Sequence, residues 1–143
     1  MTSGLPVRSL DEAVASAKCL LQKGCKNHVL ITLGADGALL LSRGAEEKPV
    51  HIEAPVVSAI DTTVNIIFTE REMCAITSNI SINLKGAGDC FLGALAFFIA
   101  THPDLALKKA IENACVVASV SVQRNGTQPS FPRWDELSGL LPL

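Results

Sequence analysis

The sequence has few aromatic residues and little charge of either sign. Its 143 residues include five phenylalanines, one tryptophan and no tyrosine, and the formal net charge is −2. Proteins that bind nucleic acids need clustered lysine and arginine for the phosphates and, for single strands, aromatic platforms for the bases. We therefore expect no nucleic-acid partner.

Long hydrophobic runs and paired cysteine motifs are also missing. The most apolar run, residues 90–100, is about half of the roughly 20 residues that a membrane span needs. The first residues lack the basic and apolar regions of a signal peptide. The five cysteines form no C-x-x-C pair, which argues against a zinc site or a disulfide scaffold. We expect reduced thiols, no membrane association, and a cytoplasmic location with the nucleus as an alternative.

The chain is nevertheless rich in apolar residues. They make up 48% of the sequence against 18% charged residues, and the mean hydropathy is +0.35. This balance excludes intrinsic disorder, and the length suits one domain. So high a hydropathy also suggests that some apolar surface is covered by another domain, another subunit or further chain.

The first part of the chain predicts one helix followed by strands. A capping-box pattern opens a helix at residues 9–24, and a glycine closes it. Residues 28–33 are almost continuously apolar, which is typical of a strand buried on both faces of a parallel sheet. Further short strands are expected at residues 38–41, 50–52 and 56–60.

The last part of the chain predicts helices. An apolar helix should begin near Gly86, and Asp104 should cap a second helix that reaches about Gln123. A short helix is expected at residues 133–140, with Pro132 near its first turn. Helices and strands in this order indicate a layered α/β fold.

The string Gly86-Ala87-Gly88-Asp89 stands at the head of the apolar helix. Glycines allow close approach of a ligand, and the unpaired first-turn amides carry a partial positive charge that favours phosphate. The Asp89 carboxylate beside them could accept a proton from an attacking hydroxyl. A plain turn, with Asp89 complementing the helix dipole, is the alternative.

Three further strings are weaker signals by themselves. Residues 32–37 follow the buried strand at the sheet edge where open α/β sheets bind ligands. Residues 61–63 and 124–130 are also polar or glycine-containing. Taken alone, residues 32–37 are better explained as a plain turn, and each of the other two strings could be only a cap or a loop.

Together and in this order, the four strings resemble the ribokinase family of carbohydrate kinases. The family signature D-T-T-G-A-G-D is matched by residues 61–63 and 86–89, and the family's later loop by residues 126–130. The resemblance implies an α/β chain that is the C-terminal part of a ribokinase-like, Rossmann-type three-layer fold and is incomplete. Residues 1–143 would then form one partial carbohydrate kinase domain.

The resemblance also implies roles for individual residues. Asp89 matches the catalytic base, and the anion hole matches Gly86, Ala87 and Gly88. The positions that match ATP-binding residues are Thr32, Leu33, Gly34, Ala35, Asp36, Gly37 and Asn113. The positions that match the potassium loops, mostly through backbone carbonyls, are Asp61, Thr63, Ser121, Arg124, Gly126 and Ser130. MgATP would phosphorylate D-ribose to ribose 5-phosphate, with K⁺ bound beside the anion hole.

Residues 64–85 interrupt the signature. Removing these 22 residues joins Thr63 to Gly86 and restores the signature. The segment reads as an insert from retained intervening sequence or an alternative exon, and a surface loop with a hairpin is the alternative. The family's G-G-x-x-x-N and N-x-x-E motifs do not occur in the sequence. We therefore expect a fragment or variant of such a kinase.

Two other functions stay open. One is a non-catalytic variant that binds nucleotide or associates with a full-length kinase, or with a second copy of itself. The other is a related sugar or nucleoside kinase with a different acceptor. Cys90, beside Asp89, is expected to be a buried inert thiol; a lowered pKa at the helix N-terminus is the alternative.

Overall fold

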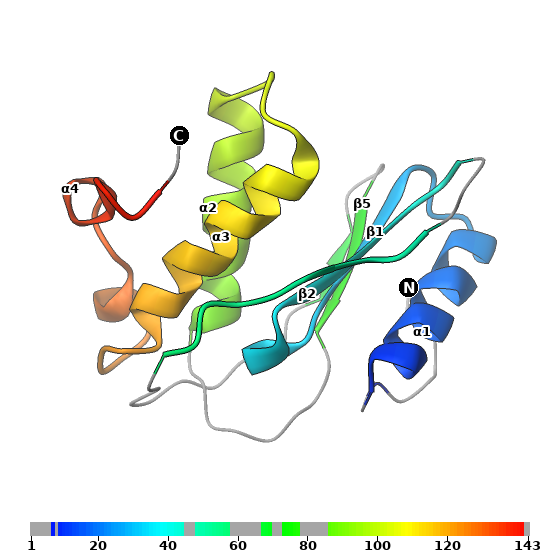
Figure 1. Ribbon diagram of the computed structural model, residues 1–143, viewed down its shortest axis with the longest axis horizontal. Helices are drawn as coiled ribbons and strands as arrows, with labels where there is room; N and C mark the ends of the chain where they lie inside the picture. The colour runs from blue at the N-terminus through cyan, green and yellow to red at the C-terminus, as the bar shows by residue number, and fades with distance from the viewer. Residues whose placement is uncertain are drawn as a thin grey trace. The chain divides into compact units, whose positions relative to one another are not determined.

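The chain consists of two compact units. The computed structural model describes residues 7, 9–44, 48–57, 67–69, 73–77 and 86–141. Residues 1–52 and 65–80 form the first unit, and residues 53–64 and 81–143 form the second. The first unit holds a β-sheet with one helix, and the second holds the remaining helices (Figure 1).

The first unit opens with helix α1, Leu10–Gln22. The Ser9 hydroxyl accepts a hydrogen bond of 3.2 Å from the backbone N–H of Glu12, which satisfies one of the orphaned donors at the helix start. Gly24, with φ of 114°, takes the left-handed conformation that commonly follows a helix C-terminus. The predicted helix at residues 9–24 is confirmed, with each end trimmed by one or two residues.

The sheet of the first unit has five strands in the order β3-β2-β1-β5-β4. Their bounds are His28–Thr32 for β1, Ala38–Ser42 for β2, Val50–Ile52 for β3, Ile67–Thr69 for β4 and Met73–Thr77 for β5. Strand β1 pairs antiparallel with β2 and parallel with β5. The sheet is therefore mixed, whereas the apolar run in β1 predicted a parallel sheet.

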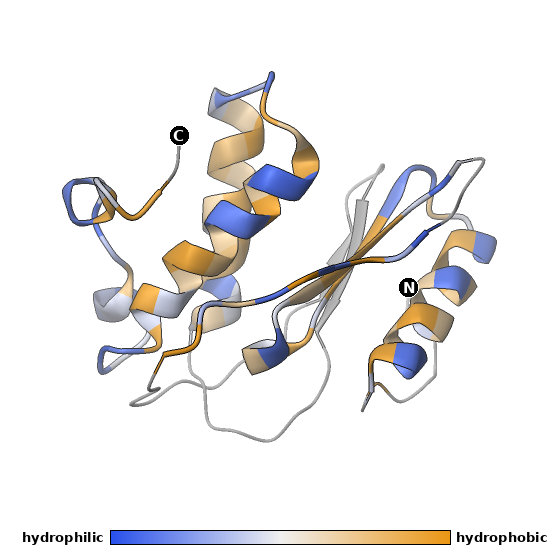
Figure 2. Cartoon of the chain, viewed as in Figure 1, coloured by the Kyte–Doolittle hydropathy of each residue, from blue (hydrophilic) through white to orange (hydrophobic). Residues whose placement is uncertain are grey.

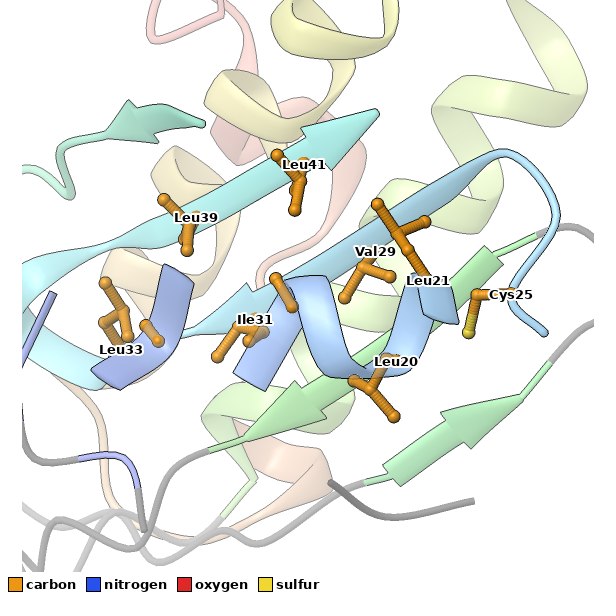
Figure 3. Packing of buried hydrophobic residues seen from close by; sticks show 10 residues of the cluster. Leu20, Leu21, Cys25, Val29, Ile31, Leu33, Leu39 and Leu41 are labelled. Atoms are coloured by element: carbon orange, nitrogen blue, oxygen red, sulfur yellow. The ribbon is translucent and has the colours of Figure 1, made fainter. Parts of the chain in front are cut away.

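One face of this sheet packs against α1. Figure 3 shows side chains of α1, β1 and β2 that meet in one cluster. The buried members are Ala13, Ala17, Leu20, Leu21, Cys25, Val29, Ile31, Leu33, Leu39 and Leu41. Burying a leucine or isoleucine side chain stabilises a fold by about 1.5–3 kcal/mol, so this cluster holds the first unit together. Leu30 is also fully buried. Strand β1 is therefore buried on both faces, as its apolar run predicted.

The described parts of the segment at residues 64–85, which are residues 67–69 and 73–77, contribute to the sheet. Strands β4 and β5 lie within this segment and pair antiparallel. This pairing matches the hairpin that the sequence analysis gave as the alternative to an insert. Strand β5 joins the sheet beside β1 and so does more than form a surface loop. The origin of the segment as an insert stays a hypothesis.

Two sequence-based expectations, the strand at residues 56–60 and the reduced state of all cysteines, need correction. Val56 and Val57 are not in a strand, and Val56 is fully exposed, because no neighbouring strand pairs with them among the described residues; residues 58–60 lie outside these. Cys19, Cys90 and Cys115 are not in disulfides, but Cys25 is disulfide-bonded. An odd cysteine count does not prevent one bridge, and spacing does not show which cysteines a fold brings together.

The second unit is built on two helices that pack side by side (Figure 1). These are α2, Ala87–Thr101, and α3, Leu107–Ser121. Figure 2 shows α2 as hydrophobic along most of its length. Its side chains Cys90, Phe91 and Leu95 are buried, as are seven residues of α3. Those of α3 are Ala110, Ile111, Asn113, Ala114, Cys115, Val117 and Ser121.

The ends of two helices differ from the sequence prediction. Helix α3 begins at Leu107 after Ala106, without a side-chain cap, because Asp104 lies in a turn closed by the bond from Leu105 N–H to the His102 carbonyl. Helix α4, Trp134–Leu137, is shorter than the expected 133–140. The extended backbone of the residue that follows it ends the helix. None of the helices that the structure describes has the length and apolar character needed to cross a membrane.

Candidate active site

The start of α2 presents unpaired backbone amides. Gly86 is the N-cap, in the left-handed conformation with φ of 96°, and its carbonyl accepts the first intrahelical bond from Cys90 N–H at 2.8 Å. The N–H groups of Ala87, Gly88 and Asp89 therefore precede the helical hydrogen-bond ladder and have no partner within the helix. Together with the helix dipole they favour an anion.

Gly86 also lies directly against the loop at residues 124–131. A Cβ atom added to Gly86 would stand 3.1 Å from the Thr127 Cα atom and 3.3 Å from Cε1 of Phe131. A side chain here would force these neighbours to shift by a few tenths of an ångström, so positive φ and close approach both favour glycine. The structure thus brings together two of the strings that the sequence singled out, residues 86–89 and 124–130.

The Asp89 side chain lies on the first turn of α2 and is exposed. Its carboxylate makes no hydrogen bond or ion pair with any residue that the structure describes. Asp89 also lines a pocket of about 300 Å³ within the second unit. The other lining residues are Cys90, Gly93, Ala94, Phe97, Phe98, Val117, Phe131, Pro132, Trp134 and Leu137. A free carboxylate beside a pocket is available to accept a proton from a bound hydroxyl.

The end of α3 and the loop after it hold four of the predicted potassium positions, Ser121 in the helix and Arg124, Gly126 and Ser130 beyond it. The Ser121 carbonyl accepts a bond from Arg124 N–H at 3.2 Å, and the buried Ser130 hydroxyl donates to the Thr127 carbonyl at 2.5 Å. Gly126 has φ of 93°, which turns the chain sharply between them. The Arg124 guanidinium is paired with Glu136, so its charge is compensated and the loop is compatible with a bound cation.

The buried surroundings of Cys90 make its thiol unreactive. It is buried, and its Sγ atom lies 3.9 Å from the Val117 carbonyl. Burial raises the pKa of the Cys90 thiol, and this effect outweighs a hydrogen bond with Ser121 that lowers it. The helix N-terminus therefore does not activate Cys90, and the alternative of a lowered pKa is wrong.

The predicted ATP-binding turn at residues 32–37 belongs to the first unit. A 3₁₀ turn, Gly34–Asp36, follows β1, and the Leu33 N–H donates to the Gly37 carbonyl at 2.7 Å. The Asp36 carbonyl lies 2.7 Å from Nε2 of His51. Gly34, with φ of 65°, has open space where a Cβ would stand, so a ligand can approach the backbone of this turn.

Asn113, Asp61 and Thr63 are the remaining predicted site residues. Asn113 on α3 is 1% exposed, and neither polar atom of its side chain has a hydrogen-bond partner among the residues that the structure describes. A buried unpaired amide is costly, so Asn113 is set up for a polar partner. Asp61 and Thr63 lie outside the described residues. Across the parts of the chain that are described, no three His, Cys, Asp or Glu side chains gather as a metal site.

Sequence reasoning missed two features of this region. One is the aromatic part of the pocket, where the Phe97 and Trp134 ring centroids lie 5.3 Å apart. The other is Glu136, which binds Arg124. The only local signal for Glu136 was its position three residues after Arg133, where a helix-capping glutamate is common.

Known proteins resemble this chain both in sequence and in structure. No family model matches the chain. The chain is 39% identical to the ribokinase of Mus musculus over 130 residues, which is 91% of this chain and 33% of the relative. It is 31% identical to the deoxyribokinase of Salmonella typhimurium over 141 residues, 99% of this chain and 37% of the relative.

A solved structure shows the same relationship. The Arabidopsis thaliana ribokinase complexed with ribose and ATP superposes with a TM-score of 0.70 at 28% identity, covering 99% of this chain and 37% of that one. The chain thus spans about a third of the length of the curated relatives it matches. From the shared fold, the shared sequence and the glycine-rich start of α2, the chain belongs to the ribokinase family of carbohydrate kinases.

Proposed function

We propose that this chain carries the phosphoryl-transfer site of a ribokinase-type enzyme that converts D-ribose and ATP to ribose 5-phosphate and ADP. The observation that carries the proposal is the free Asp89 carboxylate one residue beyond the unpaired amides of Ala87 and Gly88. The relatives named ribokinase and deoxyribokinase support a pentose acceptor.

In this proposal Asp89 is the general base. Its carboxylate takes the proton from the sugar hydroxyl as that oxygen attacks the γ-phosphorus. A new P–O bond forms to the sugar, and the bond from the γ-phosphorus to the bridging oxygen of ADP breaks. The amides at the start of α2 bind the transferring phosphoryl oxygens, where charge must be stabilised.

Other residues would bind the co-substrate and ions. The resemblance assigns ATP contacts to residues 32–37, where the turn is open at Gly34. It assigns one also to Asn113, whose buried amide has no hydrogen-bond partner among the described residues. Magnesium would arrive with ATP. Potassium would be held by carbonyls of the loop that includes Gly126 and would supply positive charge beside the phosphate.

The test is a coupled assay for ADP with purified protein, MgATP and KCl, using D-ribose and 2-deoxyribose as alternative acceptors. The proposal predicts acceptor-dependent ADP formation that is lost in Asp89→Asn. The matched control is Asp104→Asn, an exposed aspartate in the turn before α3. Acceptor-independent ADP formation, or equal rates in wild type and Asp89→Asn, would reject the role of Asp89.

A second candidate is nucleotide binding without transfer, favoured by the chain's match to only about a third of its relatives' length. In this case MgATP raises the melting temperature by mass action, yet no ADP forms with any acceptor. The two functions are thus separated by measuring the thermal shift and the ADP yield on the same sample.

A further inference from the structure

An ionic clamp connects the loop after α3 to the C-terminal segment. The Arg124 guanidinium binds both carboxylate oxygens of Glu136, at 2.8 and 3.2 Å. Glu136 also accepts the backbone N–H of Arg133 at 2.6 Å. The guanidinium and the planar carboxylate fit each other in this two-point arrangement, so the clamp fixes orientation as well as distance.

The clamped loop is the one that touches the start of α2. Residues 124–131 run from the clamp at Arg124 to the contacts of Thr127 and Phe131 with Gly86. Within the loop, Ser130 N–H bonds to the Thr127 carbonyl at 3.0 Å. A short, internally bonded segment thus connects Arg124 to the contact with Gly86.

The C-terminal segment packs only partly against α2. The pocket of about 300 Å³ lies between α2 and residues including Phe131, Trp134 and Leu137, and Trp134 is 53% exposed. A hydrogen-bonded ion pair adds direction to this partial packing.

We propose that Arg124 and Glu136 are positioning residues that hold the loop at residues 124–131 against the start of α2. Gly86 thereby keeps the orientation that presents the amides of Ala87 and Gly88. The link to catalysis rests on the proposed function, whereas the positioning itself is a property of the fold. Because both side chains are more than a third exposed, the clamp adds little to global stability.

The experiment is hydrogen exchange resolved by NMR at the bonded amides of Cys90, Ser130 and Phe131. Glu136→Gln removes the charge but keeps an acceptor for Arg133. We expect exchange at these amides to rise about threefold or more, since local opening becomes easier, while the melting temperature stays within about 3 °C of wild type. Arg124→Lys, which keeps charge but loses the two-point geometry, should give a smaller rise.

The matched control is Glu112→Gln, which removes an equally exposed ion pair with Lys109 on α3 and should leave exchange at Cys90 unchanged. Exchange at wild-type rates in Glu136→Gln and Arg124→Lys would overturn the proposal. So would an equal rise in Glu112→Gln. A second readout is the ATP-induced thermal shift, which Glu136→Gln should reduce. If wild type shows no such shift, the proposed function fails while the exchange data still decide the positioning role.

Discussion

Replacing Gly86 with alanine tests the geometry of the site most sharply. Gly86 has φ of 96°, and its added Cβ would stand 3.1 Å from the backbone of Thr127. Left-handed backbone costs a non-glycine residue about 1–2 kcal/mol, and overpacking against backbone costs about 1–3 kcal/mol more. We expect Gly86→Ala to lower the free energy of unfolding by about 2–5 kcal/mol.

Two other glycines separate these contributions. Gly24 has φ of 114° but open space around its added Cβ, so Gly24→Ala should cost only the backbone strain, about 1–2 kcal/mol. Gly93 lies within α2 and has neither positive φ nor a close neighbour. Gly93→Ala should therefore stabilise the helix by about 0.5–1 kcal/mol.

The assay is urea unfolding followed by circular dichroism. With a denaturant slope of about 2 kcal/mol/M, a loss of about 3 kcal/mol lowers the midpoint by about 1.5 M. Gly86→Ala should show the lowest midpoint of the three variants and Gly93→Ala the highest. If Gly86→Ala is no less stable than Gly24→Ala, the close contact with Thr127 does not exist as described.

Three further predictions follow from single side chains. Asp89→Asn should keep the wild-type fold and any ATP-induced thermal shift but lower phosphoryl transfer by at least about a hundredfold; a loss of less than tenfold would argue against a general base. A thiol reagent at pH 8 should label the half-exposed Cys19 before the buried Cys90 and Cys115, because burial raises the pKa of the Cys90 thiol and raises that of Cys115 to about 11; mass spectrometry showing Cys90 labelled first would contradict this. Phe98→Ala should destabilise the protein by about 3–5 kcal/mol in urea unfolding, since Phe98 is 1% exposed, and a loss below about 1 kcal/mol would show that this core is not packed.

Local signals were read correctly from the sequence. The cap formed by Ser9 and Glu12 and the stop at Gly24 depend on neighbours within a turn or two, so the bounds of α1 follow from them. Strands β1, β2 and β3 were also found, because apolar runs bounded by turn residues are local patterns. The predicted cap at Asp104 was wrong because a capping residue must lead directly into its helix. Here a turn separates Asp104 from α3.

Tertiary features were outside the reach of the sequence. The string from Gly86 to Asp89 was identified, but its contact with Thr127 depends on residues some 40 positions apart. The pairing of β5 with β1 likewise brings residues 73–77 into the sheet, although the composition of the segment at residues 64–85 suggested an insert. The bond between Arg124 and Glu136 has no periodic signature, so only the folded chain reveals it.

The central claim is that the amides at the start of α2 bind the phosphates of a nucleotide. An NMR titration of the ¹⁵N-labelled protein with MgATP measures this directly at the N–H groups of Ala87, Gly88 and Asp89. The account predicts saturable shifts at these amides that exceed those at Leu107, the first residue of α3, and that are lost in Gly86→Ala. Unchanged signals at residues 87–89 while MgATP binds elsewhere would contradict it.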